Sequence, residues 1–216
     1  IAVWLVALLM KGEAAAELTG FAMAMRERMV PVDPGAEGGP LVDTCGTGGD
    51  GGVTFNISTV SAFVVAAAGA RVAKHGNRSI SSKCGSADLL EMLGVNISLD
   101  AAQMGEALQK VGIGFLFAPV LHPAMRHAQP ARLELKIRTV FNMLGPLANP
   151  AGAPYQLVGA YSDAAASLMA EALAALGCRR GFVVHAEDGL DEITTTGPTR
   201  VWHVNEGRVE QMRVTP

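Results

Sequence analysis

The stretch LVDTCGTGGDGGVTFNIST, residues 41–59, decides the fold of this chain. Its first five residues are typical of a short buried strand, and a cluster of glycines follows them directly. Glycines allow backbone N–H groups to approach an anion closely. Residues 54–59 then supply hydroxyl and amide groups at the start of a predicted helix, whose N-terminal end attracts negative charge. The stretch therefore predicts a strand, loop and helix that together bind a phosphate-bearing ligand.

Two common nucleotide-binding loops do not match, and one simpler alternative stays open. A Walker A loop ends in Lys followed by Ser or Thr, and no such pair follows the glycines at 46–52. A dinucleotide-binding loop requires an acid at a strand end about 20 residues further on, and none is found there. A glycine cluster on its own is also typical of a plain turn. The prediction of binding therefore depends on the hydroxyl and amide groups that follow.

Outward from this unit, strands and helices alternate along the chain. We expect further strands at 71–75, 113–118, 155–161, 180–186 and 199–204. We expect a buried helix at 61–69 and other helices at 86–94, 100–112, 131–144 and 163–176. The helix at 131–144 is expected to end at Gly145-Pro146, a typical stop signal. Such alternation predicts an α/β fold, with a mainly parallel sheet flanked by helices.

The N-terminal 40 residues have a different pattern. Residues 1–29 carry apolar side chains at helical spacing and predict two helices, and PVDPGAEGGP (31–40) predicts a hinge. We therefore expect residues 1–35 to be part of a small helical domain with its hinge, and 36–216 to form an α/β domain. The apolar run at 1–10 is too short for a membrane span and lacks the basic start of a signal peptide, so we expect a fragment that begins inside a helix bundle.

Composition limits the classes of partner. The chain has 216 residues, of which 50% are hydrophobic, enough for a sizeable core. Its formal net charge of −3 disfavours a nucleic-acid-binding protein, which needs a basic surface to match phosphates. No membrane partner is expected. The three cysteines (Cys45, Cys84 and Cys178) are odd in number and far apart, which favours the reducing cytoplasm over a disulfide-stabilised secreted protein.

A second polar segment follows the next expected strand. KHGNR (74–78) carries two cations and an amide. Ligands of open α/β sheets bind outside the carboxyl ends of the strands, so this segment and the glycine cluster are expected to face one crevice. Lys74 would then be a point charge for phosphate. Judged alone, the segment would be an exposed basic turn.

Two further features supply carboxylates and arginine. DGLDE (188–192) places neighbouring carboxylates after a strand, which suits Mg²⁺ because that ion takes few protein ligands and keeps waters and substrate phosphates. Arg132 and Arg138 lie on one predicted helix, and an arginine fork suits a carboxylate ligand. An acidic surface turn and helical ion pairs are the alternatives for these features when each is judged alone.

Several long segments together resemble anthranilate phosphoribosyltransferases. They occur in the order and spacing of that family and span most of the chain from Leu41 on: GTGGDGGVTFNIST (46–59), KHGNRSISSKCGSADLLEMLG (74–94), HPAM (122–125), RTVFNMLGPLANP (138–150) and DGLDEIT (188–194). The resemblance implies a nucleoside phosphorylase/phosphoribosyltransferase-like fold. It also implies an active site at the hinge between the two domains, in a chain truncated at both ends.

The same resemblance implies a reaction: transfer of the 5-phosphoribosyl group from phosphoribosyl pyrophosphate (PRPP) to the amine of anthranilate, the second step of tryptophan biosynthesis from chorismate. The implied PRPP-binding residues are Gly46, Gly49, Asp50, Thr54, Asn56, Ser58, Thr59, Lys74 and Ser86. The implied anthranilate-binding residues are Gly46, Asn77, His122, Arg132 and Gly145, and the implied Mg²⁺ ligands are Ser58, Asp191 and Glu192. No general acid or base is assigned. A cytoplasmic homodimer, joined through the helical domain, is also implied.

One departure and two alternatives accompany this resemblance. Lys136 stands where many family members have Gly, which concerns helix packing and no assigned role. A pyrimidine nucleoside phosphorylase shares the architecture, although its basic stretch differs from KHGNR (74–78). A non-enzymatic, nucleic-acid-binding relative would use the same scaffold and would need a basic surface. Phosphorolysis of thymidine and a gel-shift assay distinguish these two alternatives from phosphoribosyl transfer.

Overall fold

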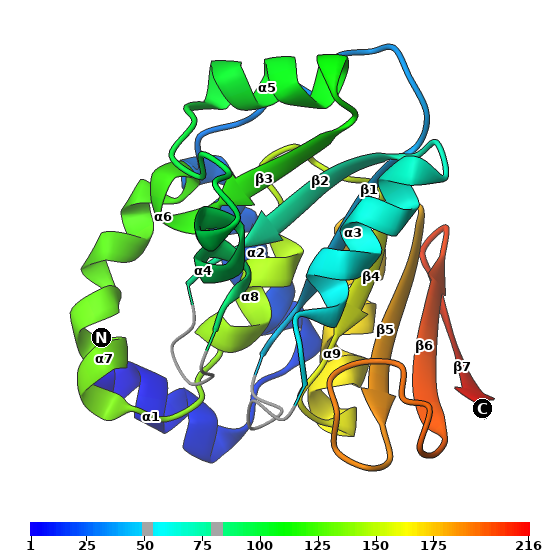
Figure 1. Ribbon diagram of the computed structural model, residues 1–216. Coiled ribbons are helices and arrows are strands. Elements are labelled where there is room, and N and C mark those ends of the chain that lie inside the picture. The colour runs from blue at the N-terminus through cyan, green and yellow to red at the C-terminus, as the bar shows by residue number, and fades with distance from the viewer. Residues whose placement is uncertain (49–53, 79–83) are drawn as a thin grey trace.

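A single seven-stranded sheet forms the centre of the computed structural model, which describes residues 1–48, 54–78 and 84–216 (Figure 1). The strand order is β3–β2–β1–β4–β5–β6–β7. Parallel pairing joins β1 (Leu41–Gly46), β2 (Arg71–Gly76), β3 (Ile113–Phe117), β4 (Tyr155–Gly159) and β5 (Arg180–Ala186). Antiparallel pairing adds β6 (Thr199–Asn205) and β7 (Arg208–Val214). The prediction of a mainly parallel sheet is confirmed.

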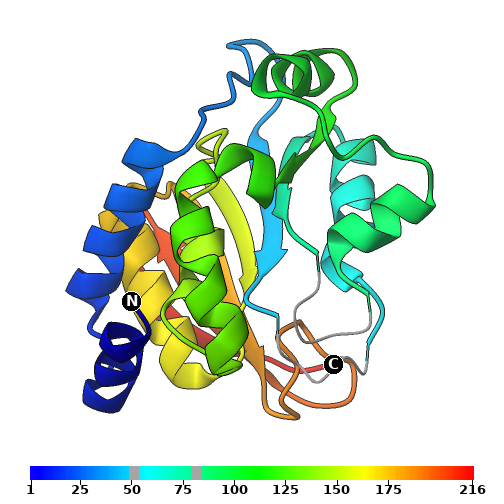
Figure 2. The same ribbon diagram turned by 90° about the vertical axis from the view of Figure 1, so that its left-hand side faces the viewer.

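Helices cover both faces of the sheet (Figure 2). One face carries α3 (Ile57–Ala67) and α4 (Ser86–Met92), and the other carries α2 (Ala15–Arg28), α8 (Phe141–Leu147) and α9 (Asp163–Ala175). The remaining helices are α1 (Ala2–Lys11), α5 (Ala101–Lys110), α6 (Ala118–Leu121), a 3₁₀ turn (Pro123–His127) and α7 (Gln129–Leu135). The segment from α6 to α8 leads from β3 to β4 and forms one wall of the site described below.

The main hydrophobic core lies between the sheet and the second group of helices. Leu18 of α2 is fully buried in the same cluster as Met143 of α8 and Leu173 of α9. Arg26 of α2 reinforces this contact, because its Nε donates a 2.8 Å hydrogen bond to the carbonyl oxygen of Leu147. Helix α2 therefore packs directly against α8, which carries several residues of the site.

Residues 61–69 were predicted to form a buried helix; a helix is present there, but most of it is not buried. Helix α3 is present but buries only Thr59 and Ala62, whereas α9 buries six residues. The outer side chains Val60, Phe63 and Val64 of α3 are 48%, 49% and 63% exposed. The reason is that α3 rests with one side on β1 and β2, and in the described part of the chain nothing else packs closely on its outer side. Apolar composition alone did not show whether this helix is packed against other elements on all sides or on one side only.

The single helix predicted at 131–144 is also wrong. Helix α7 ends at Leu135, and Lys136 takes a left-handed conformation with φ 51° and ψ 28°. This conformation is costly for a residue with a side chain and easy for glycine, which matches the position where the resembling family has Gly. The chain re-enters a helix at Phe141, and α8 continues past Gly145-Pro146 to Leu147 instead of stopping there.

The seventh strand was not predicted. Strand β7 is joined to β6 by a tight turn in which Glu206 (φ 46°) and Gly207 (φ 82°) are both left-handed, as a two-residue hairpin requires. Its residues are almost all exposed, so they lack the alternation of buried and exposed side chains that identifies a strand in a sequence.

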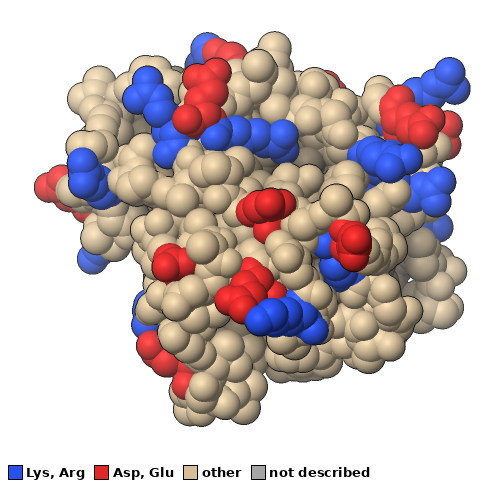
Figure 3. Space-filling model, turned by 90° about the horizontal axis from the view of Figure 1, so that it is seen from above, with Lys and Arg blue, Asp and Glu red and all other residues tan. Residues whose placement is uncertain are grey.

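The surface has mixed charge on the face seen in Figure 3, where acidic and basic side chains are interspersed among uncharged ones. Surface ion pairs include Arg78 with Glu91 at 2.8 Å and Arg213 with Glu187 at 3.0 Å. Within the described ranges, no helix has both the length and the apolar character needed to cross a membrane.

Candidate active site

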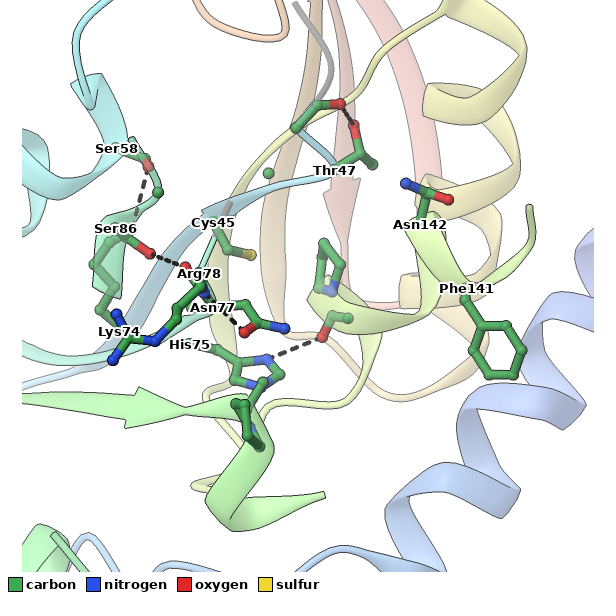
Figure 4. A pocket seen from close by; sticks show the side chains of 18 of the residues that line it. Cys45, Thr47, Ser58, Lys74, His75, Asn77, Arg78, Ser86, Phe141 and Asn142 are labelled. Atoms are coloured by element: carbon green, nitrogen blue, oxygen red, sulfur yellow. Dashed lines mark hydrogen bonds between the residues drawn. The ribbon is translucent and has the colours of Figure 1, made fainter. Parts of the chain in front are cut away.

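A cavity of about 810 Å³ opens at the carboxyl ends of β1 and β2. Its walls come from the ends of these strands, the starts of α3 and α4, the segment from α6 to α8, the loop after β5, and Met25 of α2 (Figure 4). This is the position at which open α/β sheets bind ligands, and the volume suits a ligand larger than a single phosphate.

Most of the predicted site residues meet in this cavity. Those that line it are Gly46, Thr54, Asn56, Ser58, Lys74, Asn77, Ser86, His122, Arg132, Gly145, Asp191 and Glu192. Thr59 does not line it, because its side chain is buried within the first turn of α3. Gly49 and Asp50 lie outside the described residues. Sequence segments up to 146 residues apart, from Gly46 to Glu192, are thus brought to one place.

We call one end of the cavity the lysine end (Gly46, Ser58, Lys74, Asp191 and Glu192) and the other the arginine end (His75, His122, Arg132, Phe141 and Gly145). The lysine end is built on the strand termini and on the loop after β5. The arginine end is built on the last residues of β2 and on the segment from α6 to α8. The two ends hold their charged groups in different ways.

Lys74 is only 3% exposed, and its ammonium group already has two acceptors. It donates to the backbone oxygen of Thr44 at 2.5 Å and to Oγ of Ser58 at 3.2 Å. Burial lowers the pKa of Lys74, and the nearby carboxylate of Asp43 opposes that shift. The predicted phosphate-binding cation therefore stands in the cavity wall with two of its three N–H donors hydrogen-bonded to described residues. A ligand can accept from the third donor, and more contacts would require one of these bonds to break.

Asp43 is fully buried beneath the lysine end and was not predicted to matter. Its carboxylate accepts hydrogen bonds from Nδ2 of Asn149 at 2.7 Å and from the backbone N–H of His75 at 3.0 Å. Burial is the main reason that the pKa of Asp43 is raised. These bonds fix the end of β2, and with it the starting points of the Lys74 and His75 side chains.

The loop after β5 presents Asp191 and Glu192 to the cavity. Asp188 organises this loop, since its Oδ2 accepts hydrogen bonds from the hydroxyls of Thr194 at 2.7 Å and Thr196 at 2.5 Å. Two glycines make room for it. A Cβ at Gly159 would lie 1.8 Å from the carbonyl oxygen of Asp191, and one at Gly46 would lie 3.3 Å from its Oδ2.

Metal-binding groups are sparse at this loop. Among the described residues, no three His, Cys, Asp or Glu side chains gather into a cluster of the kind that holds a metal ion by protein ligands alone. Two carboxylates and the hydroxyl of Ser58 are nevertheless hard oxygen donors in one cavity. That set suits Mg²⁺, which completes its coordination with water and substrate oxygens.

Two buried histidines form the floor of the arginine end. Nδ1 of His75 donates to the carbonyl oxygen of Gly145 at 3.0 Å, because a carbonyl can only accept. Nε2 of His75 therefore accepts from Nε2–H of His122 at 3.1 Å when both rings are neutral. Burial lowers the pKa of His75 to about 3 and that of His122 to about 4, so both rings are uncharged near neutral pH.

Arg132 is a half-buried cation in the wall of the cavity. Within the described ranges, none of its atoms lies within 4.0 Å of an acidic oxygen, and Glu134 is not its partner. Burial lowers the pKa of Arg132, and no neighbouring charge offsets that effect. Its guanidinium carbon instead lies over the ring of Phe141, 5.4 Å from the ring centre. Arg138, the second predicted arginine, stacks on Tyr161 at 4.9 Å and does not line the cavity.

Some lining residues were missed at the level of sequence. Phe141, Asn142 and Met25 face the cavity, and only Met25 comes from outside the quoted motifs. Phe141 and Asn142 lie within RTVFNMLGPLANP (138–150). Because one continuous helix was predicted there, the turn that directs these two side chains to the cavity was missed. Position 136 could have indicated this turn, because many members of the family that the sequence resembles have Gly there.

Two family models match the chain. Residues 38–216 match the α/β domain of the glycosyl transferase family, and residues 1–29 match the helical bundle domain of that family. Among curated relatives, anthranilate phosphoribosyltransferase of Solibacter usitatus is 64% identical over all 216 residues, and that of Moorella thermoacetica is 54% identical. The chain spans only 64% and 63% of the length of these two relatives.

Solved structures resemble the chain over the same extent. Anthranilate phosphoribosyltransferase from Thermus thermophilus has a TM-score of 0.91 at 51% identity, and the chain covers 63% of it. The Saccharomyces cerevisiae enzyme in complex with PRPP and Mg has a TM-score of 0.82 at 33% identity. The same yeast enzyme in complex with 4-fluoroanthranilate has a TM-score of 0.83 at 31% identity, and the chain covers 59% of each yeast structure.

Proposed function

Because the chain belongs to the glycosyl transferase family, with anthranilate phosphoribosyltransferases as its relatives, we propose that the protein transfers a phosphoribosyl group from PRPP to the amine of anthranilate. This would be the second step of tryptophan biosynthesis from chorismate. One observation carries the proposal most directly: Arg132 stands in the cavity wall as a desolvated cation, and no carboxylate of the described residues pairs with it. Such a group suits a small ligand that brings its own carboxylate.

The division of roles follows the two ends of the cavity. We propose that the lysine end, together with Thr54, Asn56 and Ser86, binds PRPP, and that Gly49, Asp50 and Thr59 contribute from the adjoining stretch. The arginine end, with Gly46 and Asn77, receives anthranilate. Residues 1–35 would then be part of the small helical domain and hinge, and 36–216 the PRPP-binding domain, a division that the matched ranges 1–29 and 38–216 support.

Magnesium is proposed as the cofactor, with Ser58, Asp191 and Glu192 as its protein ligands. The hard oxygen donors in the cavity fit this ion, and the yeast relative has been solved in complex with PRPP and Mg. When bound, the ion supplies charge neutralisation for the pyrophosphate that leaves.

The chemistry proposed for the chain's own residues is mainly positioning. The amine nitrogen of anthranilate forms a bond to C1 of the ribose while the bond from C1 to the pyrophosphate oxygen breaks, and the amine loses one proton. Arg132 holds the acceptor by its carboxylate, which places the weakly nucleophilic amine next to C1. The two neutral histidines do not repel the electron-poor ribose that forms as pyrophosphate departs. No described side chain is assigned as a general base.

The cellular setting is part of the same proposal. We expect a cytoplasmic enzyme that forms a homodimer through its helical domain and binds neither nucleic acid nor membrane. Exposed apolar side chains on the N-terminal helices, such as Val3 and Met10, are consistent with a covered surface there.

The fluorescence of anthranilate provides the direct test. The protein from the complete gene is mixed with anthranilate, PRPP and Mg²⁺, and we expect fluorescence to fall with formation of phosphoribosylanthranilate and an equal amount of pyrophosphate. No fluorescence change, together with release of thymine from thymidine and phosphate, would favour a pyrimidine nucleoside phosphorylase. A gel shift at moderate salt in place of both activities would favour a nucleic-acid-binding protein.

A further inference from the structure

The guanidinium of Arg132 needs a partner that orients it without occupying its donors. A neighbouring carboxylate would hold the arginine in place, but it would also use the N–H groups that a ligand needs. In the described ranges Arg132 has no such carboxylate, and its guanidinium lies over the face of Phe141. An aromatic face attracts a cation through its π electrons and leaves the N–H groups at the edge of the guanidinium plane available.

We propose that Phe141 is a positioning residue for the acceptor carboxylate: its ring holds the Arg132 guanidinium in the orientation that binds the ligand. This inference rests on the proposed function, since it names a further determinant of how the same site selects anthranilate. Phe141 acts through Arg132 and makes no contact of its own with the reacting atoms.

The ring of Phe141 is well placed for this task. Phe141 is the first residue of α8, directly after the turn that separates α8 from α7, the helix that carries Arg132. The backbone N–H of Thr139 donates to Oδ1 of Asn142 at 3.0 Å, which fixes the start of α8. The Phe141 ring packs on the main hydrophobic core and extends towards the N-terminal helices (Figure 4). The helix start and the core together hold the ring still.

The chain offers a matched control. Arg138 lies over the ring of Tyr161 at 4.9 Å, a contact of the same kind whose ring also packs against the main core, but neither residue lines the cavity. Loss of the Tyr161 ring removes an arginine–aromatic contact between two residues that do not line the cavity. Any effect that both substitutions share is therefore an effect on the fold, and a difference between them reports on the cavity.

The experiment is a double-mutant cycle read by calorimetric titration of anthranilate into the protein from the complete gene. Phe141→Leu keeps an apolar side chain and removes the ring face, Phe141→Tyr keeps the ring, and each is combined with Arg132→Ala. We expect Phe141→Leu to weaken anthranilate binding about three- to thirtyfold, the range of a cation–π contact. Phe141→Tyr should bind like the wild type. In the Arg132→Ala background, Phe141→Leu should change the affinity less than about twofold.

Pentafluorophenylalanine at position 141 keeps the test decisive if Phe141→Leu fails to fold. The fluorinated ring has nearly the same shape but no negative face, so it should weaken anthranilate binding while the melting temperature stays close to that of the wild type. Tyr161→Leu should leave anthranilate affinity unchanged.

Three results would overturn the inference: unchanged affinity with the fluorinated ring, equal losses in the presence and absence of Arg132, or the same loss in Tyr161→Leu. Turnover is measured in parallel so that the two proposals can fail separately. If the wild type binds anthranilate without transferring a phosphoribosyl group, the proposed function fails and the cycle still decides the role of Phe141. If the wild type transfers the group and the cycle shows independent effects, only the inference on Phe141 fails. A wild type that does not bind anthranilate overturns both.

Discussion

The two ends of the cavity hold their cations by opposite means. At the lysine end, Lys74 is buried and already donates hydrogen bonds to Thr44 and Ser58. At the arginine end, Arg132 lies over the face of Phe141, and the part of the chain that the structure describes places no carboxylate within ion-pair distance of it. Where polar side chains are hydrogen-bonded to one another, the binding free energy of a ligand is spread over many residues. Where a single cation contacts the ligand, most of that free energy depends on the cation. Substitutions at the two ends should therefore differ in size and in which substrate they affect.

The largest effect is expected at the lysine end, from Asp191→Asn combined with Glu192→Gln. The double variant removes both carboxylates that would hold Mg²⁺ against pyrophosphate, so turnover should fall at least about a hundredfold. PRPP binding, measured by calorimetry, should lose its dependence on Mg²⁺ while the melting temperature changes little. Glu187→Gln, an acidic residue paired with Arg213 on the surface, is the control and should retain turnover. Unchanged Mg²⁺ dependence in the double variant would contradict the assignment.

The next effect isolates the arginine end. Arg132→Ala should raise the anthranilate KM about ten- to a hundredfold, because a hydrogen bond to a charged group contributes about 1.5–3 kcal/mol. The KM for PRPP should change little, since that substrate is held at the lysine end. Arg132→Lys should rescue the anthranilate KM only in part, because an ammonium lacks the planar fork. A lower melting temperature with an unchanged anthranilate KM would mean that Arg132 only supports α7.

A smaller effect comes from the backbone support of the lysine end. Gly159→Ala places a Cβ against the carbonyl oxygen of Asp191, so the loop must move. We expect a loss of about 1–3 kcal/mol in the free energy of unfolding, the range for overpacking, together with a higher KM for PRPP. Gly197→Ala is the control, because a Cβ there meets nothing within 4 Å. Equal stability of the two variants in urea denaturation would show that the loop does not depend on Gly159.

The smallest expected effect is that of pH on the anthranilate KM and on stability, through the two buried histidines. With pKa values of about 3 and about 4 in the folded protein, neither His75 nor His122 titrates between pH 6 and 8. The anthranilate KM should therefore stay constant within about twofold over that range. Below about pH 6.5 the unfolded chain binds protons that the folded chain does not, so stability should fall as the pH drops towards 4.

Denaturation curves at several pH values check this second expectation. The variant His75→Gln with His122→Gln should lose stability less steeply than the wild type between pH 6.5 and 4. A midpoint that falls equally in both proteins would show that the histidines do not cause the loss.

Much of the fold could be predicted because its signals are local. The strand, glycine loop and helix at 41–59 and the strand–helix alternation after it determine a mainly parallel sheet, and the family resemblance found in the same segments is confirmed by the matching relatives. The predictions that failed concern features that depend on what packs around an element. The exposure of α3 depends on what packs against it, and the hidden strand β7 has no buried face to produce a pattern.

Most of the residues that line the cavity could be predicted from the sequence, but the contacts that hold their side chains could not. The motifs identified Lys74 and Arg132 because strand ends and family segments converge there. They could not show that Lys74 already has two acceptors, or that Phe141 turns to face Arg132 after the left-handed Lys136. The first feature arises from a contact between two strands that are 30 residues apart. The second arises from a turn between two helices, where the sequence pattern had predicted one continuous helix. The roles assigned to all the site residues stay predictions, and Gly49 and Asp50 also lie outside the described residues.

Calorimetric titration of anthranilate and of aniline shows whether Arg132 selects the acceptor by its carboxylate. The two ligands differ only in that carboxylate. We expect the wild type to bind anthranilate at least about tenfold more tightly than aniline, and Arg132→Ala to lose this preference. Equal affinity for both ligands in the wild type, or a preference that survives in Arg132→Ala, would contradict this expectation.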